Sequence, residues 1–180
     1  MQRIFIGIPI DKHSQQHINE LVEPIKCSRL DIRWVAENNR HLSLAFLGDQ
    51  PISRVDNLLR LFAETYQQEI QFQYRLSSLN RFPDTRGRII ALTDEPDRRL
   101  DNLFQITLKL LQKINIEIDR KKFRPHITLG RIRRPKHVKT SFDQRTDINV
   151  EINQVTLFQS TLTESGSIYT ALKVIHLPPK

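Results

Sequence analysis

Residues 125–131 read Pro-His-Ile-Thr-Leu-Gly-Arg, and this stretch indicates the type of fold. It places a histidine, an apolar residue, a hydroxyl residue and a second apolar residue in a row. Side chains alternate between the two faces of a β-strand, so His126 and Thr128 share one face and the two apolar residues share the other. The stretch therefore predicts a strand that packs into a core on one side and presents a polar pair on the other.

A second stretch repeats the pattern at residues 41–48, which read His-Leu-Ser-Leu-Ala-Phe-Leu-Gly. Here His41 and Ser43 form the polar pair. One such pair is more often structural than functional. Two pairs at a spacing that other segments share favour a functional role. The histidine positions differ by 85 (126 minus 41), and residues 88–91 resemble residues 3–6 at the same offset (88 minus 3).

This offset predicts a single bilobal domain, residues 1–180, built from two pseudo-repeats of about 1–85 and 86–180. If a pseudo-two-fold axis relates the two repeats, the two histidine strands would face each other across a cleft. Apolar periodicity predicts the other elements. They are strands at 3–8, 32–36, 72–76, 88–93, 150–159 and 168–176, helices that begin near residues 14, 53 and 96, and mostly loop at 133–149.

The net charge of +8 is distributed unevenly. Residues 120–139 hold nine basic residues and no acidic one, and removing them leaves 19 basic residues (28 minus nine) against 20 acidic ones. A basic run is usually a solvated surface. This run surrounds the second polar pair, which favours a phosphate-rich polyanion such as RNA as the partner.

The chain carries one cysteine, Cys27, so it cannot form an intrachain disulfide. Its apolar runs fall far short of the ~20 residues that cross a bilayer. The N-terminal stretch is too short and too soon polar for a signal peptide. These features predict a cytoplasmic protein that does not contact a membrane, and we expect a monomer.

Two histidines can divide acid and base chemistry between them. Because the unperturbed pKa of histidine is about 6.5, one ring can accept a proton near neutral pH while the other donates one. The hydroxyls of Ser43 and Thr128 can donate hydrogen bonds to phosphate oxygens. Neither polar pair is joined by a carboxylate and the chain has no CxxC motif, so we expect no metal and no cofactor.

The paired motifs resemble those of the two-histidine (2H) phosphoesterase superfamily. The match is best with its LigT-like branch, the RNA 2′,3′-cyclic phosphodiesterases formerly called 2′-5′ RNA ligases. Two motifs in order, with matching flanks over nearly the whole chain, make the resemblance specific. The flanks are Arg3-Ile4-Phe5-Ile6, Trp34-Val35, Phe46-Leu47-Gly48, Leu129-Gly130-Arg131, Ser160-Thr161-Leu162, Gly166 and Tyr169.

The resemblance implies a bilobal α+β fold with antiparallel sheets and flanking helices around a central cleft. The resemblance also implies metal-independent hydrolysis of a terminal RNA 2′,3′-cyclic phosphate to a 2′-phosphomonoester. It makes His41 the proton donor to the 3′ leaving oxygen and His126 the acceptor that activates water. Ser43 and Thr128 would hold the phosphate, and Arg131 would help to bind the substrate. In the reverse sense, an RNA 5′-hydroxyl and the cyclic phosphate would join in a 2′-5′ linkage.

Several positions depart from the simple pattern. Ser43 stands where the branch usually has threonine and keeps the hydroxyl, whereas Arg40 replaces a usual leucine and predicts an added charge at the edge of the cleft. Simple alternation along the strand places Arg131 on the face that does not carry His126 and Thr128. A role in the site and a structural role for Arg131 both stay open. The same parity predicts that Phe46 packs in the core. Trp34 could stack a base but is more readily a packing residue.

Two other functions fit parts of the sequence. A related enzyme could act on a small cyclic nucleotide or a 2′-5′ oligonucleotide, although the basic run favours a longer polyanion. A non-catalytic RNA-binding module would explain the charge but not the paired motifs.

Overall fold

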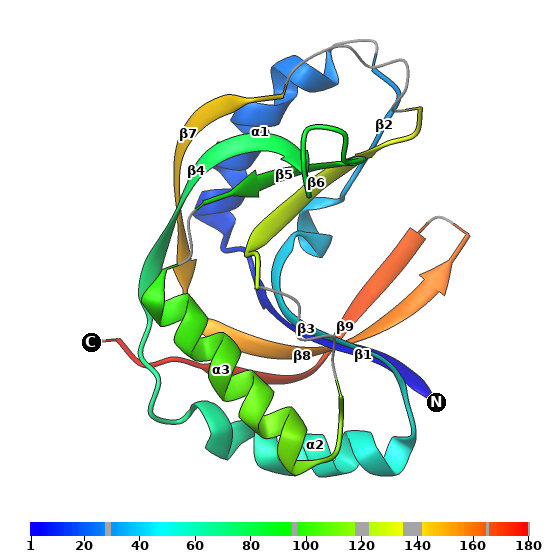
Figure 1. Ribbon diagram of the computed structural model, residues 1–180, viewed down its shortest axis with the longest axis vertical. Coiled ribbons are helices and arrows are strands. Elements are labelled where there is room, and N and C mark those ends of the chain that lie inside the picture. The colour runs from blue at the N-terminus through cyan, green and yellow to red at the C-terminus, as the bar shows by residue number, and fades with distance from the viewer. Residues whose placement is uncertain (28–29, 95–96, 118–122, 135–141, 165, 180) are drawn as a thin grey trace.

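The computed structural model describes all residues except 28–29, 95–96, 118–122, 135–141, 165 and 180. Its strands form one antiparallel sheet in the order β7-β4-β5-β6-β3-β1-β8-β9, with β2 paired to β6 (Figure 1). The predicted antiparallel α+β class is confirmed. The elements are β1 (Gln2–Pro9), α1 (Lys12–Lys26), β2 (Ile32–Trp34), a 3-10 helix (Glu37–Asn39), β3 (His41–Gln50), α2 (Ile52–Tyr66), β4 (Phe72–Phe82), β5 (Ile89–Thr93), α3 (Arg98–Lys113), β6 (His126–Ile132), β7 (Gln144–Ile152), β8 (Gln154–Thr163) and β9 (Gly166–His176).

The two histidine strands, β3 and β6, are neighbours at the centre of the sheet. They pair at Leu42 and Ile127, whose positions show the same offset of 85 (127 minus 42). The order on the two sides matches, because β1 and then β8 follow β3, while β5 and then β4 follow β6. Beyond the pairing point β3 and β6 diverge (Figure 1). The sheet is thus arranged about a pseudo-two-fold axis at this pair, while the repeat boundary near residue 85 stays a prediction.

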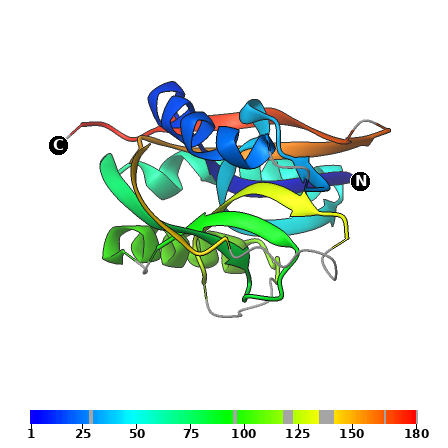
Figure 2. The same cartoon turned by 90° about the horizontal axis from the view of Figure 1, so that it is seen from above.

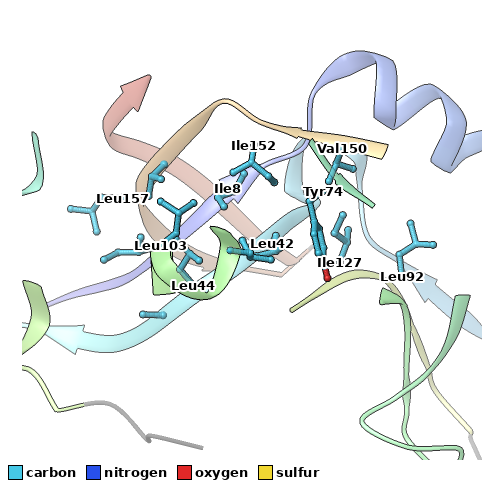
Figure 3. Close-up of a cluster of buried hydrophobic side chains, with 14 of the residues drawn as sticks. Ile8, Leu42, Leu44, Tyr74, Leu92, Leu103, Ile127, Val150, Ile152 and Leu157 are labelled. Carbon is cyan, nitrogen blue, oxygen red and sulfur yellow. The ribbon is translucent and has the colours of Figure 1, made fainter. Parts of the chain in front are cut away.

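The core lies on the sheet face opposite the histidines. Leu42 and Ile127 are fully buried there, and Leu103 of α3 joins them in one apolar cluster (Figure 3). Helix α3 packs against β3, whereas α1 packs against β7, so each helix contacts a strand far from it in sequence. Figure 2 shows these two helices on opposite sides of the molecule. Among the described residues, no helix is long and apolar enough to cross a membrane.

Both central strands contain a β-bulge, which changes which side chains reach the histidine face. In β3, Ser43 and Ala45 lie opposite consecutive residues of β1, so Leu44 is the extra residue. In β6, Thr128 and Gly130 lie opposite consecutive residues of β5, so Leu129 is extra. The two bulges again differ by 85 in position (129 minus 44). The extra residue of a bulge moves every later side chain of the strand to the other face. Counting every second residue from the histidine therefore gives the wrong face beyond the bulge.

The predicted burial of Phe46 is therefore wrong. Phe46 is 66% exposed and pairs with Phe5 of β1. Ser43 pairs with Gly7, two residues from Phe5, so Phe46 and Ser43 lie on the same face of the sheet, the histidine face. The equivalent residue in β6 is Arg131 (131 minus 46 is also 85). Arg131 pairs with Ile89 of β5, and Thr128 pairs with Ala91, two residues away. Arg131 therefore also lies on the histidine face, and its side chain is exposed.

Other sequence predictions need smaller corrections. Residues 144–149, predicted as loop, belong to β7, where alternating residues such as Ile148 and Val150 are buried against the core. The helix predicted to begin at Ser53 begins at Ile52, after Pro51. The C-terminal hairpin is confirmed as β8 and β9, but its first strand runs over residues 154–163 rather than 150–159, because residues 150–152 end β7. Several members of the basic run, at residues 120–122, 136 and 139, lie outside the described residues.

Candidate active site

The four predicted polar residues come together around the Leu42–Ile127 pair. His41 and Ser43 flank Leu42 in β3, and His126 and Thr128 flank Ile127 in β6. The two histidines are close enough to interact, because His126 lowers the pKa of His41. All four side chains are partly buried, whereas their apolar neighbours in the strands are buried. Two histidines and two hydroxyls therefore surround one small area of the sheet face.

Both imidazole rings are oriented by a carbonyl two residues earlier in the chain. The Nδ1 of His41 lies 2.8 Å from the carbonyl oxygen of Asn39, and that of His126 lies 2.9 Å from the carbonyl oxygen of Arg124. A carbonyl can only accept a hydrogen bond, so each Nδ1 is the protonated nitrogen that donates. The Nε2 of each ring is left to exchange protons with a ligand.

The surroundings lower the pKa of both histidines below the ordinary value of 6.5. Burial is the main cause for each, and the bond to the carbonyl opposes it. For His41 a further lowering comes from His126, and for His126 it comes from Arg124 and Arg131. Both rings are thus neutral near pH 7 in the free protein. A bound anion would raise the pKa of a nearby histidine and so favour its protonated form.

The ring of His41 lies among aromatic side chains. Phe5 of β1 is 4.7 Å away between ring centroids, and Tyr169 of β9 meets the ring edge-on at 5.3 Å. Gly7 makes room beside it, because a Cβ there would lie 3.3 Å from the His41 ring. Sequence reasoning missed Phe5 as a site neighbour, although the alternation of Phe5 and Gly7 along β1 was a usable signal.

His126 has a different, cationic setting. Phe82 stacks on its ring at 4.0 Å between centroids, with the planes 20° apart. The guanidinium of Arg124 lies 4.8 Å from the Phe82 centroid and donates to the carbonyl of Pro83 at 2.6 Å. Phe82 was missed because its strand was predicted to end at residue 76, whereas β4 continues to Phe82.

Two other predicted neighbours point away from the site. Arg40 is 3% exposed, and its guanidinium donates to Gln15 at 2.9 Å and Asn19 at 2.8 Å, both on α1. The charge predicted at the edge of the cleft is therefore buried against a helix, and that prediction is wrong. Trp34 packs against the hydrophobic core, as the packing alternative predicted.

In the part of the chain that the structure describes, no group of three or more His, Cys, Asp or Glu side chains is placed to hold a metal ion. The expectation that no metal takes part stays a prediction. The groups available for chemistry at the described site are imidazole, hydroxyl and guanidinium groups.

The antiparallel sheet and its paired histidines and hydroxyls define a two-histidine phosphoesterase. The family described as LigT like Phosphoesterase matches residues 8–91 and again residues 90–169, and the chain belongs to this family. An RNA 2′,3′-cyclic phosphodiesterase of Aquifex aeolicus is 29% identical over 97% of both chains. One from Methanothermobacter thermautotrophicus is 25% identical over 97% of this chain and 98% of its own.

Solved structures share the whole fold. A Thermus thermophilus protein superposes with a TM-score of 0.85 at 22% identity, covering 99% of both chains. Escherichia coli LigT complexed with 3′-AMP superposes with a TM-score of 0.81 at 24% identity, covering 98% of both chains. At these identities the likeness establishes the fold alone.

Proposed function

We propose that this protein hydrolyses terminal RNA 2′,3′-cyclic phosphates to 2′-phosphomonoesters without a metal. The observation that carries the proposal is the pair of histidines whose Nδ1 atoms are both held by carbonyls, with both Nε2 atoms left for one substrate. The names of the relatives from Aquifex aeolicus and Methanothermobacter thermautotrophicus support the same substrate. The partner is an RNA 3′ end, and we expect a cytoplasmic monomer.

In the proposed step, the Nε2 of His126 removes a proton from water as the water oxygen bonds to phosphorus. The bond from phosphorus to O3′ breaks, and the protonated Nε2 of His41 gives its proton to O3′. The product carries the phosphate on O2′, and exchange with solvent restores the two histidines. The same step with an RNA 5′-hydroxyl in place of water gives 2′-5′ ligation.

The electrostatic settings support this assignment of acid and base. Arg124 and Arg131 disfavour a positive charge on His126, which suits a neutral base. Neither arginine is among the groups that shift the pKa of His41, so a bound phosphate anion would favour the protonated form there. Ser43 and Thr128 would donate hydrogen bonds to the non-bridging oxygens, and Arg131 would stabilise the developing negative charge.

An exposed aromatic ring beside this site supports a nucleotide substrate. Phe46 is 66% exposed on the histidine face and lies 5.8 Å from Phe5 between ring centroids. Proteins that bind single-stranded RNA stack bases on such rings, at about 1–3 kcal/mol per base. Phe46 would therefore take the base of the terminal nucleotide.

The test uses an oligonucleotide that ends in a 2′,3′-cyclic phosphate, with a chelator present. The wild type should release the 2′-phosphate product, while His41→Ala and His126→Ala should each lose at least a hundredfold in rate, the scale of general acid-base catalysis. His13→Ala is the matched control, because His13 is exposed on α1. Absence of product, or activity that survives both site substitutions, would refute the proposal.

A further inference from the structure

Arg40 immediately precedes His41, and its side chain connects this part of the site to helix α1. The guanidinium is buried, and its Nη1 donates to Gln15 Oε1 at 2.9 Å and to Asn19 Oδ1 at 2.8 Å. Gln15 and Asn19 are four residues apart on α1 (19 minus 15), so they lie on the same side of the helix. One nitrogen of Arg40 thus joins the start of β3 to two points on α1.

The two amide side chains also use their other ends, and both reach Glu37. Gln15 Nε2 donates to the main-chain carbonyl of Glu37 at 2.9 Å, and Asn19 Nδ2 donates to the Glu37 carboxylate at 2.8 Å. Glu37 begins the 3-10 helix that leads into β3. Arg40, the two amides and Glu37 therefore form one closed hydrogen-bonded network that fixes the 3-10 helix against α1.

This network holds the carbonyl that orients the ring of His41. The carbonyl of Asn39 lies 2.8 Å from His41 Nδ1 and belongs to the peptide unit that joins Asn39 to Arg40. The N–H of the same peptide unit donates to the carbonyl of Glu37 at 3.0 Å. Because a peptide unit is planar, holding its N–H also fixes the direction of its C=O. The position of the network therefore sets the position of the group that accepts from His41.

The burial of Arg40 has a cost that packing does not explain. Among the residues that the structure describes, its Nε has no hydrogen-bond partner. Burial lowers the pKa of Arg40 below its usual value, and the charge of Glu37 opposes this. A buried polar group without a partner is destabilising, and apolar side chains of similar volume are often at least as stable in place of buried charges. The stability of the fold therefore gives no reason for an arginine at this position.

The second half of the chain supports its histidine in a different way. The offset of 85 places Pro125 at the position of Arg40 (125 minus 40). His126 Nδ1 bonds to the carbonyl of Arg124, whose peptide unit ends at the proline nitrogen and has no N–H to anchor. The ring of Phe82 stacks on His126 at 4.0 Å between centroids. An anchor through the peptide N–H is therefore possible only in the first half.

We propose that Arg40 is a positioning residue for His41. Through its network with α1 and Glu37, it holds the carbonyl of Asn39 in place. This carbonyl keeps the proton of the neutral ring on Nδ1 and leaves Nε2 directed at the substrate. The inference rests on the proposed function and extends its machinery to α1, outside both strand motifs. Arg40 itself touches no substrate, because its guanidinium faces α1.

The test combines kinetics with the protonation state of the ring. Arg40→Leu removes the guanidinium, Asn19→Ala breaks the same network from α1, and Arg40→Lys keeps a charged nitrogen donor. Tyr66→Phe is the matched control, because it removes another buried hydrogen bond, 2.8 Å long, between Tyr66 and Thr107. Each variant is assayed on a dinucleotide that ends in a 2′,3′-cyclic phosphate. The His41 ring nitrogens are observed by ¹⁵N NMR in the free protein at about pH 8, where the lowered pKa keeps the ring neutral.

We expect Arg40→Leu to lower kcat about tenfold and to change KM less than about twofold, because a misplaced acid slows the chemical step but not binding. Part of its His41 should carry the proton on Nε2, whereas the wild type carries it on Nδ1. Asn19→Ala should show both changes more weakly. The double variant should lose no more than Arg40→Leu alone, since both residues act through one network. Arg40→Lys should stay within about threefold of the wild type, because its ammonium can donate to the same amides.

Tyr66→Phe should match the wild type in both measurements. A wild-type kcat and tautomer in Arg40→Leu would overturn the proposal, and so would a loss of kcat with the tautomer unchanged or an equal loss in the control. If Arg40→Leu does not fold, Asn19→Ala decides by the same two measurements. A wild type that hydrolyses no cyclic phosphate would refute the proposed function itself, while the NMR comparison would still show whether Arg40 sets the tautomer of His41.

Discussion

Gly7 lies beside His41, and its replacement by alanine tests how tightly the site is packed. A Cβ at this position would lie 3.0 Å from the carbonyl oxygen of Leu42 and 3.3 Å from Cδ2 of His41, whereas ordinary contacts begin at 3.4 Å. The carbonyl would therefore have to give way by a few tenths of an ångström. That carbonyl belongs to the backbone between His41 and Ser43, so relieving the contact moves the link between two site residues.

The expected effect follows from this distance. A misplacement of about 1 Å costs roughly a hundredfold in rate, so a shift of about 0.4 Å (3.4 minus 3.0) corresponds to roughly sixfold in kcat on the same logarithmic scale. Overpacking costs about 1–3 kcal/mol. Alanine recovers about 0.5–1 kcal/mol of the backbone entropy that glycine loses. Gly7→Ala should therefore lose about 0–2.5 kcal/mol of unfolding free energy.

Gly48→Ala is the matched control in the same sheet. Gly48 has a φ of +67°, and a Cβ there would have no atom within 4 Å. Left-handed backbone costs alanine about 1–2 kcal/mol, so this variant should lose stability with an unchanged kcat. The assays are kcat at saturating cyclic-phosphate oligonucleotide and the free energy of unfolding in urea. A wild-type kcat for Gly7→Ala, or an equal loss of kcat in Gly48→Ala, would refute the packing argument.

Three further outcomes follow from the same geometry. Because the pKa of His41 is lowered in the free protein and His41 must be protonated, kcat/KM should peak on the acid side of neutrality and fall as pH rises. Bound phosphate raises the pKa of His41, so the alkaline limb of kcat should lie at higher pH than that of kcat/KM; coincident limbs would count against this mechanism. Phe82→Leu removes the ring that stacks on His126 and should lower kcat about 2–10-fold, from a contact of about 0.5–1.5 kcal/mol, with the pH limb of His126 shifted. Leu42→Ala, at a fully buried position, should lose about 2–5 kcal/mol of unfolding free energy in urea, and a loss under about 1 kcal/mol would contradict the assigned core.

Strand alternation was enough to predict which sheet face the four central polar residues share. The predicted faces of His41, Ser43, His126 and Thr128 hold because these residues precede the bulge in each strand. Phe46 lies beyond the bulge, so counting by twos gave the wrong face. A bulge depends on how one strand fits its neighbour, and the sequence of the strand alone does not encode it.

Contacts between distant segments explain the other differences. Arg40 is buried because Gln15 and Asn19 on α1 accept its hydrogen bonds, and neither is near it in sequence. Phe82 contacts His126 because β4 pairs with β5 to its end. Local pattern identifies which residues could be functional, but tertiary pairing decides which of them meet.

Because the site is arranged about a pseudo-two-fold axis, the orientation of the bound substrate determines which product forms. Rotation about this axis would exchange O2′ and O3′ of a cyclic phosphate held by the four polar groups. The oxygen beside the protonated His41 leaves, so the two orientations would yield 2′- and 3′-phosphates respectively. The equivalent positions Phe46 and Arg131 differ between the halves, since one is aromatic and the other cationic. We infer that this difference selects the orientation that gives the 2′-phosphate.

Phe46→Ala tests that inference through the product rather than the rate. A stacked base contributes about 1–3 kcal/mol, so its loss should shift the ratio of 2′- to 3′-phosphate by about 5–150-fold towards the 3′ product. The two products of a cyclic-phosphate dinucleotide separate by chromatography. Leu162→Ala is the control, because Leu162 is 67% exposed near the tip of the β8–β9 hairpin. If Phe46→Ala raises KM but leaves the ratio unchanged, Phe46 contributes affinity alone and the asymmetry of the two halves does not set the product.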